Sequence, residues 1–304
     1  MACISKVLQN AIGKGENLKA EVFDERKCLL GEGPTSRTAD NSLVMWVDIH
    51  NQQVHWRDTS NNVFGSFTTA EQVGFALPRK GGGTVLGVGD KLILRDPDGA
   101  ESVLESCNAS TEAPTGVKVR WNDAKIAPGG ELFAGSMAYD ITPHAGALYR
   151  ISDNQKDART IVSEVTISNG LDWTVAGDQF CYIDTLCHGL DIFDYSPQGI
   201  SERRRLISFD QSSDIPDGMC IDAEDGIWVA FCGNQKLNRY SLDGTLTESV
   251  VMPVKNITSC CFAGENLDLL ICTTAALGDP HTLLAGMTLI LRPGVRGQKI
   301  REFV

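Results

Sequence analysis

The sequence predicts an all-β protein folded as a six-bladed β-propeller, and three observations lead to this fold class. Short runs rich in Val, Ile, Trp and Tyr alternate with turns of Gly, Asp and Asn, and long helical patterns are missing. The strongest runs recur every 40 to 48 residues. Each repeat has room for about four strands, the number that a propeller blade needs.

Six apolar runs carry the repeat, and their starts lie 41, 48, 48, 47 and 40 residues apart. The runs are LVMWVDI from Leu43, TVLGVG from Thr84, LFAGSM from Leu132, FCYIDT from Phe180, IWVAFC from Ile227 and LDLLICTT from Leu267. Two β-sandwiches are the alternative architecture. A sandwich gives no reason for one period to persist from Leu43 to the C-terminus, so the period favours the propeller.

The length of 304 residues allows one large domain or two ordinary ones. We expect residues 1–19 to form an N-terminal tail and residues 20–304 to form a single propeller domain. The segment AEVFDERK, from Ala20, is expected to supply the strand that closes the ring against the last blade.

The composition, 42% apolar and 22% charged residues, is that of a soluble globular protein. With 27 Lys and Arg against 39 Asp and Glu, the net charge of −12 argues against nucleic acid and anionic membranes as partners. We read no signal peptide and no membrane segment. The ten cysteines form no CxxC pair, which favours reduced, buried thiols and a cytoplasmic location. We also expect a monomer or small homo-oligomer.

Four of the six repeats share a polar residue at one position. Counting back 10 or 11 residues from the strong run reaches Glu32, Asn122, Asn169 and Asp217. In the other two repeats the same count lands near Val73 and Gly74 or Thr258 and Ser259. Because equivalent positions of a propeller form a ring, the four polar side chains are expected to converge at one mouth of the central channel.

Each of these residues also has a structural interpretation. Asn169-Gly170 and Asp217-Gly218 are common tight-turn pairs, because Asn, Asp and Gly tolerate positive φ. Glu32 is equally typical of a solvated turn, and Asn122-Asp123 of an Asx-turn. The shared register favours a site, since independent turns would scatter along the repeat.

Carboxylate and amide oxygens suit a hard divalent cation such as Ca²⁺, Mg²⁺ or Mn²⁺, whereas Zn²⁺ more often takes His or Cys. Three protein ligands leave positions open for water and substrate. Arg120 lies two residues before Asn122, so both side chains point to the same side of an extended segment, although a lone Arg beside Asp123 is also typical of a surface salt bridge. Asp140 lies at the far end of the strand that holds Phe133 and is within reach of the same mouth.

Several motifs together resemble one known family. LGEGP, RWND, ISNGLDWT, YIDT, IPDGMCIDAEDGIWVA and TSCCF are similar to the senescence marker protein family, also called regucalcin or gluconolactonase. The resemblance runs from about Val22 to the last repeat. It implies a six-bladed propeller with one divalent metal ion in the channel (Ca²⁺, Zn²⁺, Mn²⁺ or Mg²⁺) and, for most members, hydrolysis of sugar lactones.

Carried over to this sequence, the resemblance implies metal ligation by Glu32, Asn169 and Asp217 and substrate contacts from Arg120, Asn122 and Asp140. Asp123 matches a position near the metal that binds a second ion in some relatives. We expect Asp217 to be the general base of a metal-dependent lactonase acting on a small sugar lactone. A non-catalytic calcium-binding regulator and a metal-dependent esterase or phosphotriesterase remain alternatives.

Two departures from the family pattern bear on this expectation. Ser36 stands where the family usually has Trp, which is expected to open the entrance of the channel or to loosen the first blade. Asp140 stands where vertebrate members carry Glu, and its shorter reach is expected to change which sugar hydroxyl is recognised.

Overall fold

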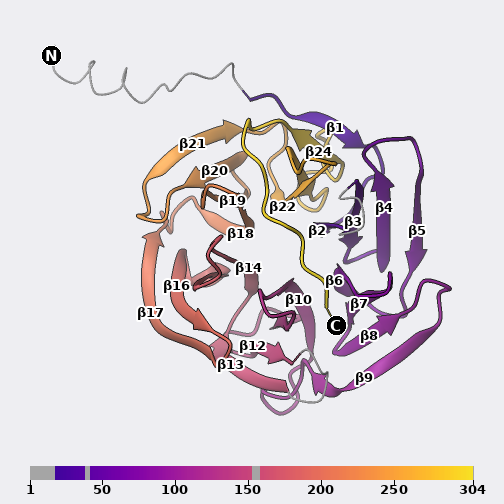
Figure 1. Cartoon of the computed structure of the whole chain (residues 1–304), viewed down its shortest axis with the longest axis vertical. Coiled ribbons are helices and arrows are strands. Elements are labelled where there is room, and N and C mark those ends of the chain that lie inside the picture. The colour runs from indigo at the N-terminus through magenta and orange to yellow at the C-terminus, as the bar shows by residue number, and fades with distance from the viewer. Residues whose placement is uncertain (1–17, 38–41, 153–157, 304) are drawn as a thin grey trace, which may run out of the picture.

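The computed structural model describes residues 18–37, 42–152 and 158–303, and these form six four-stranded antiparallel sheets arranged in a ring (Figure 1). This architecture confirms the predicted six-bladed β-propeller. Neighbouring sheets touch through their innermost strands in the order β2, β6, β10, β14, β18 and β22, and β22 returns to β2. Most of the predicted tail, residues 1–17, lies outside the described residues.

The strands of each sheet are consecutive in the chain except in the last sheet, and within each sheet they run in order from the inside of the ring outward. The first three sheets are β2 (Gly31–Ser36), β3 (Leu43–Asp48), β4 (Gln53–Asp58) and β5 (Phe64–Thr68); β6 (Val73–Pro78), β7 (Thr84–Val88), β8 (Lys91–Arg95) and β9 (Glu101–Asn108); and β10 (Val119–Ile126), β11 (Leu132–Ala138), β12 (Gly146–Ile151) and β13 (Ala158–Val165).

The other three sheets are β14 (Ser168–Trp173), β15 (Gln179–Asp184), β16 (Gly189–Ser196) and β17 (Gly199–Ser208); β18 (Ile215–Ile221), β19 (Ile227–Cys232), β20 (Lys236–Tyr240) and β21 (Leu246–Val251); and β22 (Ile257–Ala263), β23 (Leu269–Thr274), β24 (Thr288–Leu291) and β1 (Glu21–Asp24). Within the described ranges the only helix is the 3-10 turn η1 (Thr185–Cys187), and none there is long and apolar enough to cross a membrane.

The ring closes through a sheet that joins the beginning of the described chain to its last strand. Strand β1 pairs antiparallel with β24, with Glu21 opposite Ile290, and forms the outer edge of the last sheet. The strand expected within the segment from Ala20 therefore closes the ring as predicted. Because the closing contact is a backbone ladder, it depends on main-chain hydrogen bonds as well as on side-chain packing.

Aromatic side chains fill the spaces between the sheets. Trp173 is fully buried and stacks on Phe133 of the neighbouring sheet at 4.9 Å between ring centroids. Trp121 packs edge-on against Tyr149 and Phe75. The strong apolar runs of the sequence form strands β3, β7, β11, β15, β19 and β23, the second strand of each sheet, where both faces are covered.

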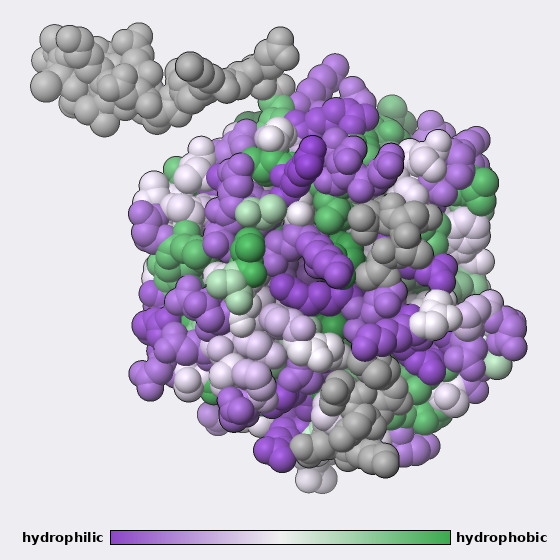
Figure 2. Space-filling model, in the orientation of Figure 1, coloured by the Kyte–Doolittle hydropathy of each residue, from purple (hydrophilic) through white to green (hydrophobic). Residues whose placement is uncertain are grey.

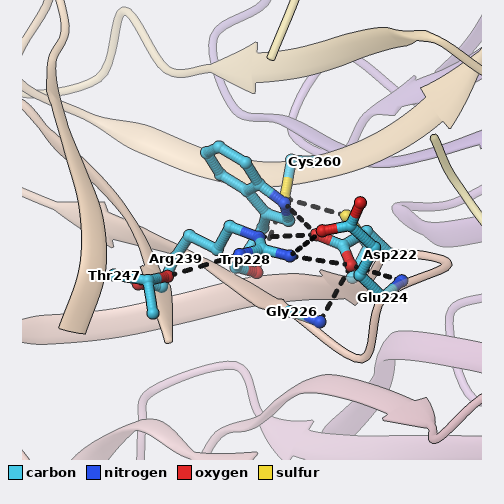
Figure 3. A network of polar contacts seen from close by, with 8 residues as sticks. Asp222, Glu224, Gly226, Trp228, Arg239, Thr247 and Cys260 are labelled. Atoms are coloured by element: carbon cyan, nitrogen blue, oxygen red, sulfur yellow. Dashed lines mark hydrogen bonds and ion pairs between the residues drawn. The ribbon is translucent and has the colours of Figure 1, made fainter. Parts of the chain in front are cut away.

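A buried carboxylate fixes the turn between β18 and β19 (Figure 3). Asp222 is fully buried and accepts hydrogen bonds from the Gly226 amide at 2.8 Å, the Trp228 Nε1–H at 2.9 Å and the Arg239 Nε–H at 2.7 Å. Three donors, one of them charged, satisfy the oxygens of a group that would otherwise be costly to bury. This network explains the segment IDAEDGIW as a structural motif rather than a site.

The C-terminal strap, residues 292–303, crosses one face of the ring from β24 towards β6 (Figure 1). Its backbone bonds in turn to Leu267, to Ala223 and to Pro78 and Lys80, which belong to three different blades. The side chain of Phe303 is fully buried in the core between the β6 and β10 sheets. The face that the strap crosses is mostly hydrophilic (Figure 2). The strap therefore ties distant blades together.

We predict that Phe303→Ala lowers the free energy of unfolding by about 3–5 kcal/mol, because it removes a fully buried aromatic ring from a packed core. Urea denaturation measures this change. The exposed neighbour Lys299→Ala serves as the control and should change stability by less than about 0.5 kcal/mol. Equal stability of the Phe303→Ala protein and the control would show that the strap does not hold the ring.

Candidate metal centre

All six innermost strands lose their regular pairing near the same end. The register shift lies between Glu32 and Thr35 in β2, Val73 and Phe75 in β6, Trp121 and Ala124 in β10, Ser168 and Leu171 in β14, Pro216 and Met219 in β18, and Ile257 and Ser259 in β22. Such an irregularity leaves residues unpaired and turns their side chains in a new direction. The four residues selected by register lie at or inside these interruptions.

The turn interpretation of the two glycine pairs is wrong. Asn169 and Gly170 lie within β14, and Asp217 and Gly218 lie within β18. A Cβ atom at Gly170 would lie 2.8 Å from the backbone oxygen of Asp217, so glycine is required for the close approach of two inner strands rather than for positive φ. Asn122 likewise lies in a strand and not in an Asx-turn.

Hydrogen bonds join three of the predicted residues across two blades. The guanidinium of Arg120 donates from Nη1 to the Asn122 side-chain oxygen at 2.7 Å. The Asn122 side-chain amide donates to the side-chain oxygen of Asn169 at 2.9 Å and to the Ser168 carbonyl at 2.8 Å. All three residues are at least nine-tenths buried, so these hydrogen bonds are shielded from bulk water.

Glu32, Asp123 and Asp217 are close enough to repel one another electrostatically. Burial raises the pKa of Glu32 well above its usual value, and the charges of Asp217 and Asp123 raise it further. Burial and the charge of Asp123 raise the pKa of Asp217 in the same direction. Burial also raises the pKa of Asp123, to about 6, against the opposing effect of Lys125. Without a further cation, the three carboxyl groups therefore resist ionisation.

These residues fit a divalent cation with oxygen ligands. The Oδ1 atom of Asp217 is buried and has no hydrogen-bond partner among the described residues. A cation would satisfy that atom and relieve the repulsion between Asp217 and Glu32. The Asn169 side-chain oxygen, with one lone pair used by Asn122, keeps a second lone pair for the same purpose.

Arg120 lies beside this cluster and is 6% exposed. Burial lowers its pKa to about 10, while the nearby Tyr139 and Glu32 act in the opposite direction. Its Nη1 atom is held by Asn122 and by the Trp121 carbonyl. The surface salt-bridge interpretation of Arg120 is therefore wrong, because the side chain is buried and bonds to Asn122 rather than to Asp123.

Asp140 is less closely tied to the cluster. It lies in the exposed loop between β11 and β12, and its Oδ1 accepts hydrogen bonds from the backbone amide and the hydroxyl of Thr142. These two bonds hold the pKa of Asp140 below its usual value. The same loop places Tyr139 near Arg120, so the loop lies at the mouth while the Asp140 carboxylate is engaged with its own turn.

Sequence reasoning missed two residues near the site. Lys125 lies two positions after Asp123 on β10 and pairs with Asp172 at 3.2 Å. It lines a cavity of about 70 Å³ within the ring, together with Asp123 and Asp172. The spacing of Asp123 and Lys125 in a strand was the available signal. Thr185, in the motif YIDT, contacts Asn169 directly.

The expectation for Ser36 is wrong. Ser36 is fully buried and lies at the opposite end of β2 from Glu32, where it lines the same cavity. Its hydroxyl donates to the Phe262 carbonyl at 3.0 Å, which links β2 to β22. The serine therefore neither opens the entrance nor loosens the first blade.

A second group has metal-ligand chemistry. Cys28, Asp48 and His55 are buried and each places a possible ligand atom within 4.8 Å of the others, so by distance they could hold a metal ion. The Asp48 carboxylate, however, already accepts four N–H groups, from the amides of Leu29, Leu30 and Asn51 and from the Asn51 side chain. Four donors occupy all of its lone pairs. The channel cluster is the better candidate.

The nine cysteines in the described ranges are all free, and most are buried. Burial raises the pKa of Cys107 and of Cys232 to about 12, which keeps these thiols protonated. No disulfide joins the cysteines of the described ranges.

We predict that Glu32→Gln makes the metal-free protein relatively more stable as the pH rises. The pKa of Glu32 is higher in the folded than in the unfolded state. Its protonation therefore favours folding below the unfolded value, about 4.3, and this contribution is lost as the pH rises through the folded value. Relative to wild type, the variant should therefore gain stability between pH 5 and pH 8, because glutamine does not acquire the buried charge that destabilises the wild-type protein.

Urea denaturation of both proteins in EDTA at the two pH values measures this difference. The exposed Glu25→Gln is the control for the general loss of one carboxylate. A stability difference between Glu32→Gln and wild type that is the same at both pH values would contradict the repulsion among the three carboxyl groups.

Known proteins resemble this chain in sequence and in fold. The family model described as the SMP-30/Gluconolactonase/LRE-like region matches residues 30–276. Regucalcin of Danio rerio is 35% identical over 274 residues, which are 88% of this chain and 90% of that protein. A solved luciferin-regenerating enzyme has a TM-score of 0.86 at 26% identity over 95% of this chain and all of that one. A calcium-binding protein, regucalcin, from Agrobacterium tumefaciens has a TM-score of 0.85 at 22% identity over 95% and 98%.

Proposed function

This chain belongs to the SMP-30/gluconolactonase/LRE-like family, and from that premise we propose that it is a divalent-metal-dependent hydrolase that opens sugar lactones to aldonic acids. One observation carries the proposal. A buried, unpartnered carboxylate oxygen on Asp217 lies in a cluster of oxygen ligands near Arg120, whose remaining N–H groups are available to a substrate. Such a site combines a place for a cation with a donor for a substrate oxygen.

Glu32, Asn169 and Asp217 are the proposed ligands of the ion. When bound, a divalent ion polarises the lactone carbonyl and lowers the pKa of a coordinated water, effects worth several kcal/mol of barrier. The ion can be Ca²⁺, Mn²⁺, Mg²⁺ or Zn²⁺, since all accept oxygen ligands.

Asp217 is the proposed general base. It removes a proton from the attacking water while the water oxygen forms a bond to the carbonyl carbon. The bond from that carbon to the ring oxygen then breaks, and the ring oxygen takes up a proton to become a hydroxyl group. The reaction gives a single product, an aldonic acid, because the new acid and hydroxyl groups stay joined through the carbon chain of the sugar.

Arg120, Asn122 and Asp140 are the proposed substrate contacts. Arg120 is a donor only, so it suits the oxygen on which negative charge develops. Asn122 uses both amide hydrogens on the protein, and its oxygen accepts from Arg120, which leaves one lone pair to accept from a sugar hydroxyl. Asp140 can contact the sugar once its loop lies over the mouth, and this part of the proposal depends on the family resemblance.

We predict that Asp217→Asn folds normally and loses at least about a hundredfold in kcat, the usual range for a general base. Asparagine keeps the size of the side chain and one oxygen ligand but removes the basic oxygen. The rate should be measured with gluconolactone and other aldonolactones at saturating Mn²⁺, because weaker metal binding would otherwise lower it. The exposed Asp210→Asn is the matched control.

Retention of more than about a tenth of the wild-type kcat at saturating metal would contradict the role of Asp217 as base. Chelation tests the metal separately, since EDTA should abolish wild-type activity and added Mn²⁺ should restore it. A wild-type protein that binds Ca²⁺ but opens no lactone in the panel would instead be a calcium-binding regulator. Full activity after exhaustive chelation would contradict the metal-dependent reaction.

We predict that Asp140→Ala raises KM or alters the preference among lactones and leaves metal affinity nearly unchanged, as expected for a substrate contact outside the metal ligands. Steady-state kinetics across the lactone panel and a metal titration measure the two effects. Thr142→Val is the matched control, because it removes one hydrogen bond to Asp140 but keeps the carboxylate. Collapse of metal binding in Asp140→Ala would make this residue a ligand or a structural partner.

A further inference from the structure

The hydroxyl group of Thr185 lies between two elements of the proposed metal centre. Thr185 begins η1, directly after β15, and is 3% exposed. Its Oγ1 atom receives a hydrogen bond from the Asn169 side-chain amide at 2.8 Å and donates one to the Pro216 carbonyl at 2.8 Å. Thr185 therefore bonds to one proposed ligand and to the residue before another, Asp217.

The direction of these hydrogen bonds is determined by Pro216. A backbone carbonyl can only accept, so the single proton of the Thr185 hydroxyl is directed to Pro216. The hydroxyl oxygen is then left to accept, and its partner on Asn169 must be the NH₂ group. This places the side-chain oxygen of Asn169 on the opposite side, away from Thr185.

The other end of the chain of hydrogen bonds leads to the same orientation. A guanidinium can only donate, so Arg120 must meet the oxygen of the Asn122 side chain and not its nitrogen. The Asn122 nitrogen then points to Asn169 and requires an oxygen there. The Arg120 guanidinium, which only donates, and the Pro216 carbonyl, which only accepts, thus fix the orientations of the Asn122 and Asn169 amides.

We propose that Thr185 is a positioning residue that presents the Asn169 oxygen to the metal ion and holds β18 against β14 next to Asp217. This inference rests on the proposed metal-dependent function. Without the hydroxyl, the Asn169 NH₂ group loses its buried acceptor, and the amide is held only from its Asn122 side, so its oxygen is no longer fixed in place for the ion.

The backbone around Thr185 is held independently of its hydroxyl. The Thr185 amide donates to the Ile167 carbonyl at 3.1 Å, and the Asp184 carboxylate accepts from the amides of Thr166 and Ile167. A substitution of the side chain at position 185 therefore leaves the local fold in place. Valine has nearly the same shape as threonine and removes only the polar group.

Thr185→Val should weaken Mn²⁺ binding, measured by isothermal titration calorimetry, by about 10- to 100-fold, the usual effect of losing a group that orients a ligand. The kcat for the preferred lactone at a fixed, subsaturating Mn²⁺ concentration should fall in parallel, while KM for the lactone changes little. Thr185→Ser keeps the hydroxyl and should bind Mn²⁺ nearly as wild type does. Thr174→Val is the matched control, since Thr174 is equally buried and follows the other end of β14.

A double-mutant cycle with Asn169→Ala separates positioning from general destabilisation. If Thr185 acts through Asn169, its substitution should have little further effect on Mn²⁺ affinity once the amide is gone. Additive losses would overturn the inference, and so would wild-type affinity in Thr185→Val or equal weakening in Thr185→Ser and Thr185→Val. If the valine protein does not fold, the serine variant and Thr185→Ala in the same cycle give the answer. Absence of Mn²⁺ binding by the wild-type protein would instead contradict the proposed function itself.

Discussion

The interruption of the ladder near one end of every innermost strand is the constraint on which the site depends. Regular antiparallel pairing would point alternate side chains into the packed spaces between blades. At the interruptions the pairing fails, and residues such as Asn169 and Asp217 leave that alternation. Glycines such as Gly170 follow the polar residues because neighbouring inner strands approach each other too closely for a Cβ atom. The candidate metal centre and the close packing of the inner strands therefore depend on the same short segments.

The site is electrostatically unfavourable in the metal-free protein. Three carboxyl groups, Glu32, Asp123 and Asp217, are gathered where burial penalises their charge, and only Arg120 and Lys125 among the described residues lie nearby to offset it. The rest of the fold must stabilise this arrangement. The ladder between β1 and β24 and the strap that buries Phe303 supply contacts far from the channel mouth. Stability and function are thus placed in different parts of the ring, which is common at binding sites.

The sequence could predict the ring and much of the site, because a period of 40 to 48 residues places equivalent positions at equivalent heights. It could not distinguish a turn from a strand interruption at Asn169 and Asp217, since Asn-Gly and Asp-Gly suit both. The sequence also could not predict which side chains bond to one another across neighbouring blades. The bond of Thr185 to Pro216 and that of Ser36 to Phe262 join residues 31 and 226 positions apart, and no local pattern reports such pairs.

The central claim is that one cation binds at the mouth of the channel between Glu32, Asn169 and Asp217. Anomalous diffraction from crystals of the full chain soaked in Mn²⁺ tests it most directly, because the signal locates the ion without reference to activity. The account predicts one strong peak within about 2.0–2.6 Å of oxygens from all three residues. A peak between Cys28, Asp48 and His55 with none at the channel mouth would contradict it.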